Sequence, residues 1–443
     1  MIDHIRLLFA QSVDLKVQQL KNDDLIIEFA YISSLCDEQM ISKYVLVPFM
    51  KEEVPYDKQL RTISDYLVVD DPATWTDLLL KGNILIEAQG IVYSLYTAKI
   101  ISNESTQTQV ESAIQGPQLA LNEDLMKSLN LIRSMYHSPE LCVEEHTVGS
   151  LSKTEIIVLF DQRRVDPNVL NQLRQRLTKA QTEMLQAAGE LETILTGKQW
   201  HLFPTILITE RPDRITTAIS NGKIAILIKG NMFALVLPVT FFDFMHAVED
   251  NYEAFWMTRT LILLRYIAVV LTITLPALYV SIISYNPELF RVQLALSIAG
   301  SRSAVPYPSF IEVMVMLFMI EALIEASIRL PRYIGSTATT VGGLILGQAA
   351  QQAGLVSSIM IIVTSVVAIS NFVVPVNSLS FAIRFLKYPL IVMAIFFGIT
   401  GVTVGSFMYV VYLCNLRSFG KPYFRMFAGT KPQSGDIGQV KVE

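Results

Sequence analysis

The sequence predicts a protein of two halves: an N-terminal soluble half made of two similar small α/β domains, followed by a polytopic all-α transmembrane domain. Three observations lead to this prediction. The 443 residues are 51% hydrophobic and 17% charged, whereas a typical soluble chain carries about 25% charged residues. Residues 256–443 hold 13 Lys and Arg against 6 Asp and Glu, which leaves 22 against 34 in residues 1–255. Two patterns also recur, in the same order, within the N-terminal half.

The first recurring pattern is a strand followed by a helix. Residues 25–32 and 156–160 are rich in branched and aromatic side chains, which is typical of strands. A helix start follows each run, at Asp37 in the first copy and at Asp166 in the second. Pro167 after Asp166 suits the first position of a helix. The two copies are therefore expected to begin alike.

The second recurring pattern is built on glycines. LLLKGNILIEAQG (78–90) and AISNGKIAILIKG (218–230) each predict a helix, a glycine turn, a strand and another glycine turn. We expect one domain over residues 1–110, and a linker helix with the second domain over residues 111–255. The glycines serve turns, since neither copy contains GxGxxG or a P-loop that would indicate nucleotide binding.

Two segments between the copies have their own character. ISNESTQTQVESAIQGP (101–117) is polar and is expected to be a linker, and residues 119–137 have apolar spacing suited to a helix. The soluble half carries a net negative charge, which would repel the phosphates of a nucleic acid, so no nucleic acid partner is expected.

The C-terminal half predicts several membrane crossings over residues 256–416, with a cytoplasmic tail at 417–443. Three stretches are apolar and long enough to cross about 30 Å of hydrocarbon. A fourth is apolar but contains three glutamates, and a fifth is short, uncharged and rich in Gly and Ala. The three long apolar stretches are 261–283, 353–375 and 388–414. The stretch with three glutamates is 306–328, and the short stretch rich in Gly and Ala is 335–350.

Orientation follows from the basic residues that flank the spans. Arg417, Lys421 and Arg425 follow the last span, which predicts a cytoplasmic C-terminus. The start of the chain has too short an apolar run for a signal peptide. Unpaired thiols suit a reducing compartment. The thiols are those of Cys36, Cys142 and Cys414. We therefore expect both termini inside and four crossings, at 261–283, 306–328, 353–375 and 388–414.

The glutamates of the fourth stretch are the candidate pore-lining residues: Glu321, Glu325 and Glu312. Ionisable groups in a bilayer are expensive and usually face water or a bundle interior. Glu321 and Glu325 lie one helical turn apart on one face, and Glu312 points elsewhere. Such a face could line a cation pathway. The alternatives are pairing with Arg329 or Arg265, or a helix that lies at the membrane interface, and these readings stay open.

Other residues in this half are candidates for packing and bending. Gly343 and Gly347 form a GxxxG pair that would allow close helix contact. Pro276 and Pro375 are candidate helix hinges, although packing is the more ordinary role for such prolines.

No catalytic arrangement is visible in the sequence. The five histidines are scattered, and no Ser/His/Asp set, HExxH or CxxC occurs. We therefore expect a protein that is not an enzyme, with no cofactor and no metal.

The chain resembles the A-subunit family of spore germinant receptors, the GerA family of endospore-forming bacteria, from about residue 25 to residue 424. The membrane segments that carry the resemblance are RSAVPYPSFIEVMVM, EALIEASIRLPRYIGSTATTVGGLILGQAAQQAGLVSS and LCNLRSFGKPYF. The soluble segments are TVGSLSKTEIIVLF, TERPDRITTAISNGKIAIL and VLPVTFFDFMHAVEDNYEAFW.

The resemblance implies a role and partners. Members of the family lie in the inner membrane of the dormant spore, which would place both termini in the spore core. They work with a transporter-like B subunit, which binds the nutrient, and with a lipoprotein C subunit. The A subunit is thought to form a homo-oligomer in the lipid membrane, a nutrient-gated channel that releases monovalent cations.

The sequence departs from the family at two places. QGPQLAL (115–121) stands where family members often have an RGPREGF-type segment, and IRSMYH (132–137) replaces a run of several arginines. Two other functions compete with a channel. A non-conducting membrane scaffold would assemble the other subunits, and a secondary solute transporter would need paired membrane repeats, which these dissimilar segments do not show.

Overall fold

Two five-stranded antiparallel sheets form the centres of the N-terminal half in the computed structural model. The structure describes most of the chain: residues 1–9, 12–22, 26–50, 66–69, 71–99, 107–111, 116–197, 201–330 and 332–424.

The first sheet has the strand order β1-β2-β4-β5-β3. Its strands are β1 (Leu15–Lys21), β2 (Ile26–Ile32), β3 (Tyr66–Val68), β4 (Asn83–Ala88) and β5 (Ile91–Tyr96). The helical elements beside it are α1 (Ile2–Leu8), α2 (Glu38–Ile41), η1 (Ser42–Leu46), α3 (Val47–Met50) and α5 (Pro72–Leu80). The strand and helix predicted at 25–32 and after Asp37 are confirmed, and the Asp37 carboxylate caps the helix by accepting from Gln39 N at 2.9 Å.

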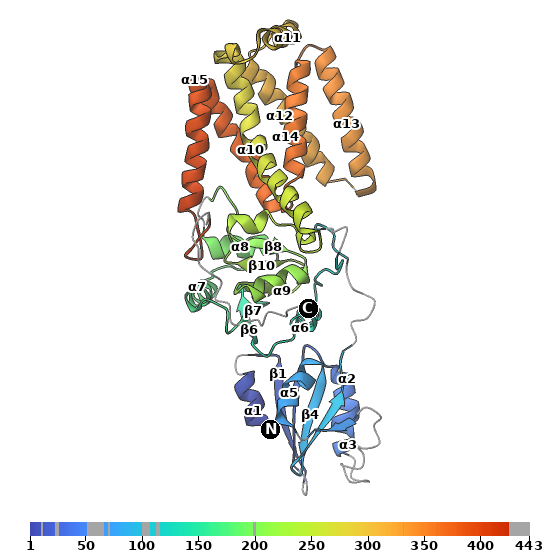
Figure 1. Ribbon diagram of the computed structural model, residues 1–443. Helices are drawn as coiled ribbons and strands as arrows, with labels where there is room; N and C mark the ends of the chain where they lie inside the picture. Colours follow the sequence, from blue (N-terminus) through green and yellow to red (C-terminus); the bar gives the residue numbers. More distant parts are fainter. Residues whose placement is uncertain are drawn as a thin grey trace, which may run out of the picture. The chain divides into compact units, whose positions relative to one another are not determined.

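Helices cover both faces of this sheet (Figure 1), because alternate side chains of a strand point to opposite faces. Phe29 belongs to a buried cluster with Ile41 and Val45 of the α2–η1 segment. Its neighbour Ala30 belongs to a second cluster with Ile5 of α1 and Leu79 of α5. Two apolar layers therefore enclose the sheet and explain its continuous hydrophobic strands.

The second sheet has the order β6-β7-β9-β10-β8. Its strands are β6 (Leu141–Val148), β7 (Thr154–Asp161), β8 (Leu207–Thr209), β9 (Ile224–Ile228) and β10 (Ala234–Leu237). Its helices are α6 (Leu125–Met135), α7 (Pro167–Thr178), α8 (Ala188–Thr196) and α9 (Pro212–Ser220), followed by the 3₁₀ turns η2 (Phe241–Phe244) and η3 (Val248–Asn251). The predicted Asp166 cap is confirmed by its contact with Asn168 N at 2.9 Å.

The two sheets have equivalent strand orders when strands are matched in chain order, as the predicted duplication requires. The glycine turns match as well. Gly82 and Gly222 follow α5 and α9 with φ of 83° and 77°, and Gly90 and Gly230 follow β4 and β9 with φ of 80° and 76°. Only glycine adopts this left-handed backbone without strain, so the matched spacing reflects a shared turn geometry.

The helix predicted over residues 119–137 is shorter than expected. It begins after Asp124, whose carboxylate accepts from Met126 N at 2.9 Å. Residues before this cap are drawn away from the helix, because Leu121 N donates to the Glu210 carbonyl at 2.8 Å.

The described chain divides into two compact units. The first comprises Met1–Val239, Phe244–Ile273 and Ser365–Leu386, and the second comprises Thr240–Asp243, Thr274–Thr364 and the described part of Lys387–Glu443. The remaining helical elements are α10 (Phe255–Tyr285), η4 (Pro287–Leu289), α11 (Val292–Arg302), α12 (Ser309–Ile328), α13 (Arg332–Gln352), α14 (Ser358–Phe372) and α15 (Asn377–Asn415).

Two of the described helices, α10 and α15, are long and apolar enough to cross a membrane, against four predicted crossings. The helix α12 matches the predicted stretch 306–328 but carries three glutamates. The prediction of one helix over 353–375 is wrong. Gly354 has φ of 66°, and α14 has 15 residues, which extend about 22 Å.

Two further apolar stretches lie within longer helices. The stretch 335–350 lies within α13, which runs for 21 residues. The stretch 388–414 lies within α15, which begins earlier and is interrupted at Gly398, where φ is 60° and ψ is −141°. After α15 the chain forms a small hairpin, β11 (Arg417–Ser418) and β12 (Lys421–Pro422), so two of the predicted basic flanking residues lie in it. Arg425 lies outside the described residues.

Candidate functional site

Glu312, in the first turn of α12, has a fully buried side chain in the second unit. Its carboxylate accepts from Ser357 N at 2.6 Å, from Ser357 Oγ at 2.5 Å and from the Tyr279 hydroxyl at 3.3 Å. Arg302 Nε lies 3.4 Å from the same carboxylate. These donors connect α12 to three other segments, so Glu312 lies in a polar cluster inside this unit.

Glu321 and Glu325, predicted to share one face, have different surroundings. Glu321 pairs with Lys387 Nζ at 2.8 Å, and the Lys387 side chain is 4% exposed. Glu325 pairs with Arg329 at 2.9 Å, one turn away on the same helix, and the two side chains are 57% and 77% exposed. The structure thus contains the Glu325–Arg329 pairing that the sequence left open, and Arg265 pairs elsewhere.

The two prolines predicted as hinges and the two glycines predicted as packing residues also have different surroundings. α10 continues through Pro276, whereas Pro375 lies in the loop between α14 and α15. The prediction that Pro375 bends a helix is wrong, because the chain leaves the helix before it. Gly343 packs on α12, where a Cβ would lie 3.4 Å from Leu323 Cδ2, while a Cβ on Gly347 would meet nothing within 4 Å.

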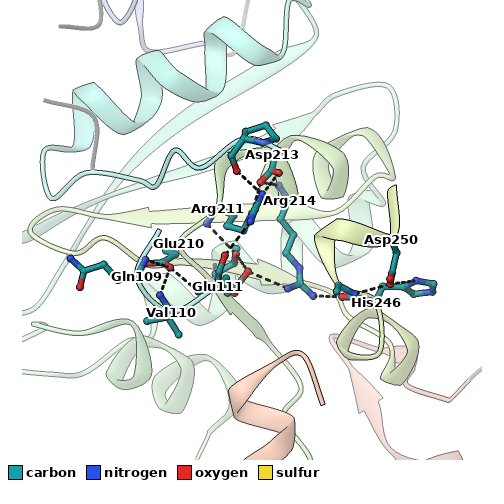
Figure 2. Close-up of polar contacts among 12 residues, drawn as sticks. Gln109, Val110, Glu111, Glu210, Arg211, Asp213, Arg214, His246 and Asp250 are labelled. Carbon is teal, nitrogen blue, oxygen red and sulfur yellow. Dashed lines mark hydrogen bonds and ion pairs between the residues drawn. The ribbon is translucent and has the colours of Figure 1, made fainter. Parts of the chain in front are cut away.

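A connected set of polar contacts in the first unit was not predicted. It links the segment between the two soluble domains, the turn from β8 to α9, and the start of α10. We call it the junction, and most of it is drawn in Figure 2. Its members are Glu111, Glu210, Arg211, Asp213, Arg214, Asp250 and Arg265.

Glu210 fixes the interdomain segment through one carboxylate oxygen. Its Oε1 accepts from three successive backbone N–H groups, those of Gln109 at 2.7 Å, Val110 at 2.5 Å and Glu111 at 2.9 Å. The residue is fully buried, and Figure 2 shows Glu210 beside Gln109, Val110 and Glu111. Hydrogen bonds to an ionised acceptor are strong, so this short segment is tied firmly to the second domain.

Arg211 is 1% exposed and makes four donor contacts. Its guanidinium pairs in a bidentate manner with Asp213 at 3.1 and 2.8 Å. It also donates to the carbonyls of Glu111 at 3.1 Å and Pro117 at 2.8 Å. Burial lowers the pKa of Arg211, but the Asp213 carboxylate outweighs it and raises the pKa above its ordinary value, so the guanidinium stays charged.

Arg214 continues the junction toward the first apolar helix. It lies 3.3 Å from Glu111 Oε2 and donates to the carbonyl of His246 at 3.3 Å. Glu111 also accepts from the Thr209 hydroxyl at 3.0 Å. Burial raises the pKa of Glu111, and Arg214 offsets only part of this effect.

Arg265 of α10 completes the junction. It donates to Asp250 Oδ2 at 2.5 Å and to the carbonyl of Met245 at 3.1 Å. The side chains of Arg265 and Asp250 are almost wholly buried. The only charge in the predicted span 261–283 is therefore neutralised by the segment just before the helix, and it fixes the helix to that segment.

Gly116 brings the interdomain segment against the residues before α10. Its φ is 110°, and a Cβ here would lie 2.7 Å from the Tyr252 ring. Gly116 belongs to QGPQLAL, the segment that departs from the family pattern. The glycine and the Pro117 carbonyl make contacts that need no arginine from this segment.

A second buried ion pair ties α6 to the turn before β1. Arg133 in α6 is fully buried and binds Asp14 at 3.0 and 2.9 Å and Ser12 Oγ at 2.6 Å. Burial alone would raise the pKa of Asp14, but Arg133 outweighs it and holds the pKa below its ordinary value. Arg133 is the arginine that remains in IRSMYH, and its contact was not predicted.

One sequence signal could have revealed the junction. ERPDR places four charged residues around the proline that starts α9, directly after the buried strand β8. Charged residues at such a position need partners if they are buried. Among the described residues, no group of three or more His, Cys, Asp or Glu side chains is placed to hold a metal ion.

Comparisons with known proteins give matches that cover most of this chain. The model of the Bacillus/Clostridium GerA spore germination protein family matches residues 3–441. Spore germination protein B1 of Bacillus subtilis (strain 168) is 34% identical over 403 residues, covering 89% of this chain and 83% of that protein. Spore germination protein GerLA of Bacillus cereus is 33% identical over 408 residues, covering 89% and 82%.

One solved structure is similar to part of the chain. It is the crystal structure of the N-terminal domain of the A subunit of the Bacillus megaterium spore germinant receptor GerK3. The identity is 23% and the TM-score is 0.42, over 54% of this chain and 94% of that chain.

Proposed function

This chain belongs to the GerA family of spore germination proteins, and from that premise we propose that it is an A-type subunit of a nutrient-responsive germinant receptor. In this proposal it lies in the spore inner membrane with both termini in the spore core. It forms or gates a homo-oligomeric pathway for monovalent cations and carries out no catalysis. Its partners are a transporter-like B subunit, a lipoprotein C subunit and membrane lipid.

The junction is the observation that carries the proposal. A receptor needs a rigid connection between the domains that meet its partners and the helices that respond. Here Glu210 and Arg211 hold the interdomain segment, Arg214 reaches the residues before α10, and Arg265 fixes the helix itself. A movement of either soluble domain would therefore act on the first apolar helix through charge-assisted contacts, most of them partly buried.

The glutamates of α12 support the cation pathway. Glu325 and Arg329 are largely exposed on this chain, and a charged pair on a membrane helix is unfavourable against lipid. Water or a second subunit would solvate the pair better, as an oligomer with an aqueous path would allow. Glu312 and Glu321 have buried partners, so Glu325 is the member of the set best placed to act on passing ions.

Cation flux through the purified full chain in liposomes tests this proposal. Glu325→Gln should lower cation selectivity and leave assembly intact, since an exposed pair contributes less than about 1 kcal/mol. Glu321→Gln should instead lower the level of assembled protein, because it leaves the buried Lys387 without its carboxylate, at about 3–5 kcal/mol. Glu288→Gln, an exposed carboxylate outside α12, is the control.

The possible outcomes are distinct. Normal assembly of Glu325→Gln with unchanged flux and selectivity would exclude the pore role of this residue, and the pathway would then be sought along the uncharged stretch 353–375. No flux from any assembled sample would favour a non-conducting scaffold.

A further inference from the structure

A cleft of about 800 Å³ lies in the first unit between the second soluble domain and the start of α15. One wall comes from α8 and from residues 201–205, and includes Glu192, Thr196 and Phe203. The other comes from the first turns of α15 and includes Phe381 and Phe385. Its lining residues include no member of the junction and no glutamate of α12.

Glu192 is the unexplained group in this cleft. It is half-buried, and among the described residues no cation pairs with its carboxylate. Burial alone raises its pKa to about 7. A carboxylate that is partly desolvated without a partner costs free energy, and a bound cation would remove that cost.

The charged groups around Glu192 leave its carboxylate available. Arg176 of α7 donates to the Leu195 carbonyl, and Arg384 of α15 stacks on the Phe381 ring at 5.1 Å. Burial, with a smaller effect from Arg176, lowers the pKa of His201. The imidazole is therefore neutral at pH 7 and offers no competing charge.

The remaining walls suit an ammonium group joined to an apolar body. The Thr193 and Thr196 hydroxyls donate to the backbone of α8 at 2.9 and 2.8 Å, which leaves their oxygens able to accept N–H groups. Phe381 and Phe385 are 43% and 69% exposed, so both rings offer apolar contact, and Phe385 also offers cation–π contact. An anion would be repelled by Glu192, and a neutral apolar ligand would desolvate the carboxylate without compensation.

We propose that this cleft binds a small organic ammonium ion that carries an apolar group, with its charge on Glu192 and its apolar part against Phe381 and Phe385. Such a ligand would join the second soluble domain to the start of α15. It would therefore stabilise one placement of this helix against the domain, whether or not the protein conducts ions.

Calorimetric titration of the detergent-solubilised full chain with benzylammonium tests the proposal, with benzyl alcohol as the uncharged analogue of the same shape. Benzylammonium should bind about tenfold or more tightly than benzyl alcohol. Glu192→Gln, which keeps the size of the side chain, should lower benzylammonium affinity to that of benzyl alcohol. Glu190→Gln removes a charge from an exposed position on the same helix and should leave the affinity unchanged.

The pH dependence supplies a check that needs no variant. Since only ionised Glu192 binds the cation, affinity in the wild-type chain should rise about tenfold from pH 6 to pH 8. Equal binding of the amine and the alcohol, equal binding by wild type and Glu192→Gln, or a pH-independent affinity would each overturn the proposal.

Discussion

Replacing Glu210 with alanine isolates the contact that fixes the interdomain segment. The carboxylate oxygen accepts three backbone N–H groups at 2.5–2.9 Å, from Gln109, Val110 and Glu111. A hydrogen bond to a charged group contributes about 1.5–3 kcal/mol. Three donors on one oxygen are not additive, and water can replace part of the loss after truncation. We therefore expect local opening of this segment to become easier by about 3 kcal/mol.

Hydrogen exchange followed by mass spectrometry measures this opening directly in the full chain. A change of about 3 kcal/mol corresponds to exchange on the order of a hundredfold faster in the peptide covering residues 107–111. Glu210→Gln keeps a neutral acceptor and should give a smaller increase. Glu155→Ala, a partly exposed partner of Lys229 on β7, is the control and should leave this peptide unchanged. Unchanged exchange of residues 107–111 in Glu210→Ala would refute the reasoning.

Three further predictions follow from other contacts. Arg133→Met leaves the buried Asp14 unpaired and should lower the free energy of unfolding by about 3–5 kcal/mol in chemical denaturation of the full chain. Gly116→Ala places a Cβ 2.7 Å from the Tyr252 ring at a left-handed φ and should destabilise by about 1–3 kcal/mol, seen as a lower Tm. Glu192→Gln should leave Tm unchanged at pH values below 4.5 but raise it at pH 8. This is because the folded-state pKa, raised from 4.5 to about 7, makes wild type lose up to roughly 3 kcal/mol as pH rises through that window.

Local patterns accounted for much of the N-terminal half. The capping aspartates Asp37 and Asp166 and the glycine turns at Gly82 and Gly222 act through neighbours within a few residues, so their spacing alone predicts the elements. The order of the two repeated patterns then predicted a shared fold, which the equivalent strand orders support.

The residues at which the apolar helices begin, end or are interrupted were predicted less well. Hydropathy identified the stretches, but helix length depends on where the backbone can no longer continue. Gly354 and Gly398 interrupt the chain inside stretches that were predicted to be continuous, and neither changes the mean hydropathy appreciably. The glutamates of α12 show the same limit, because Lys387, which pairs with Glu321, is 66 residues away.

By itself the sequence determined the family, the two-part composition, the duplicated soluble domains and the apolar stretches, because each depends on the order and spacing of nearby residues. Only the tertiary structure decided which charges meet. Asp14 with Arg133, Glu210 with the segment 109–111, and Asp250 with Arg265 are pairings between distant segments. A charged residue that becomes buried requires a partner, and there are many candidates along the chain. Only the fold determines which of them lies within hydrogen-bonding distance.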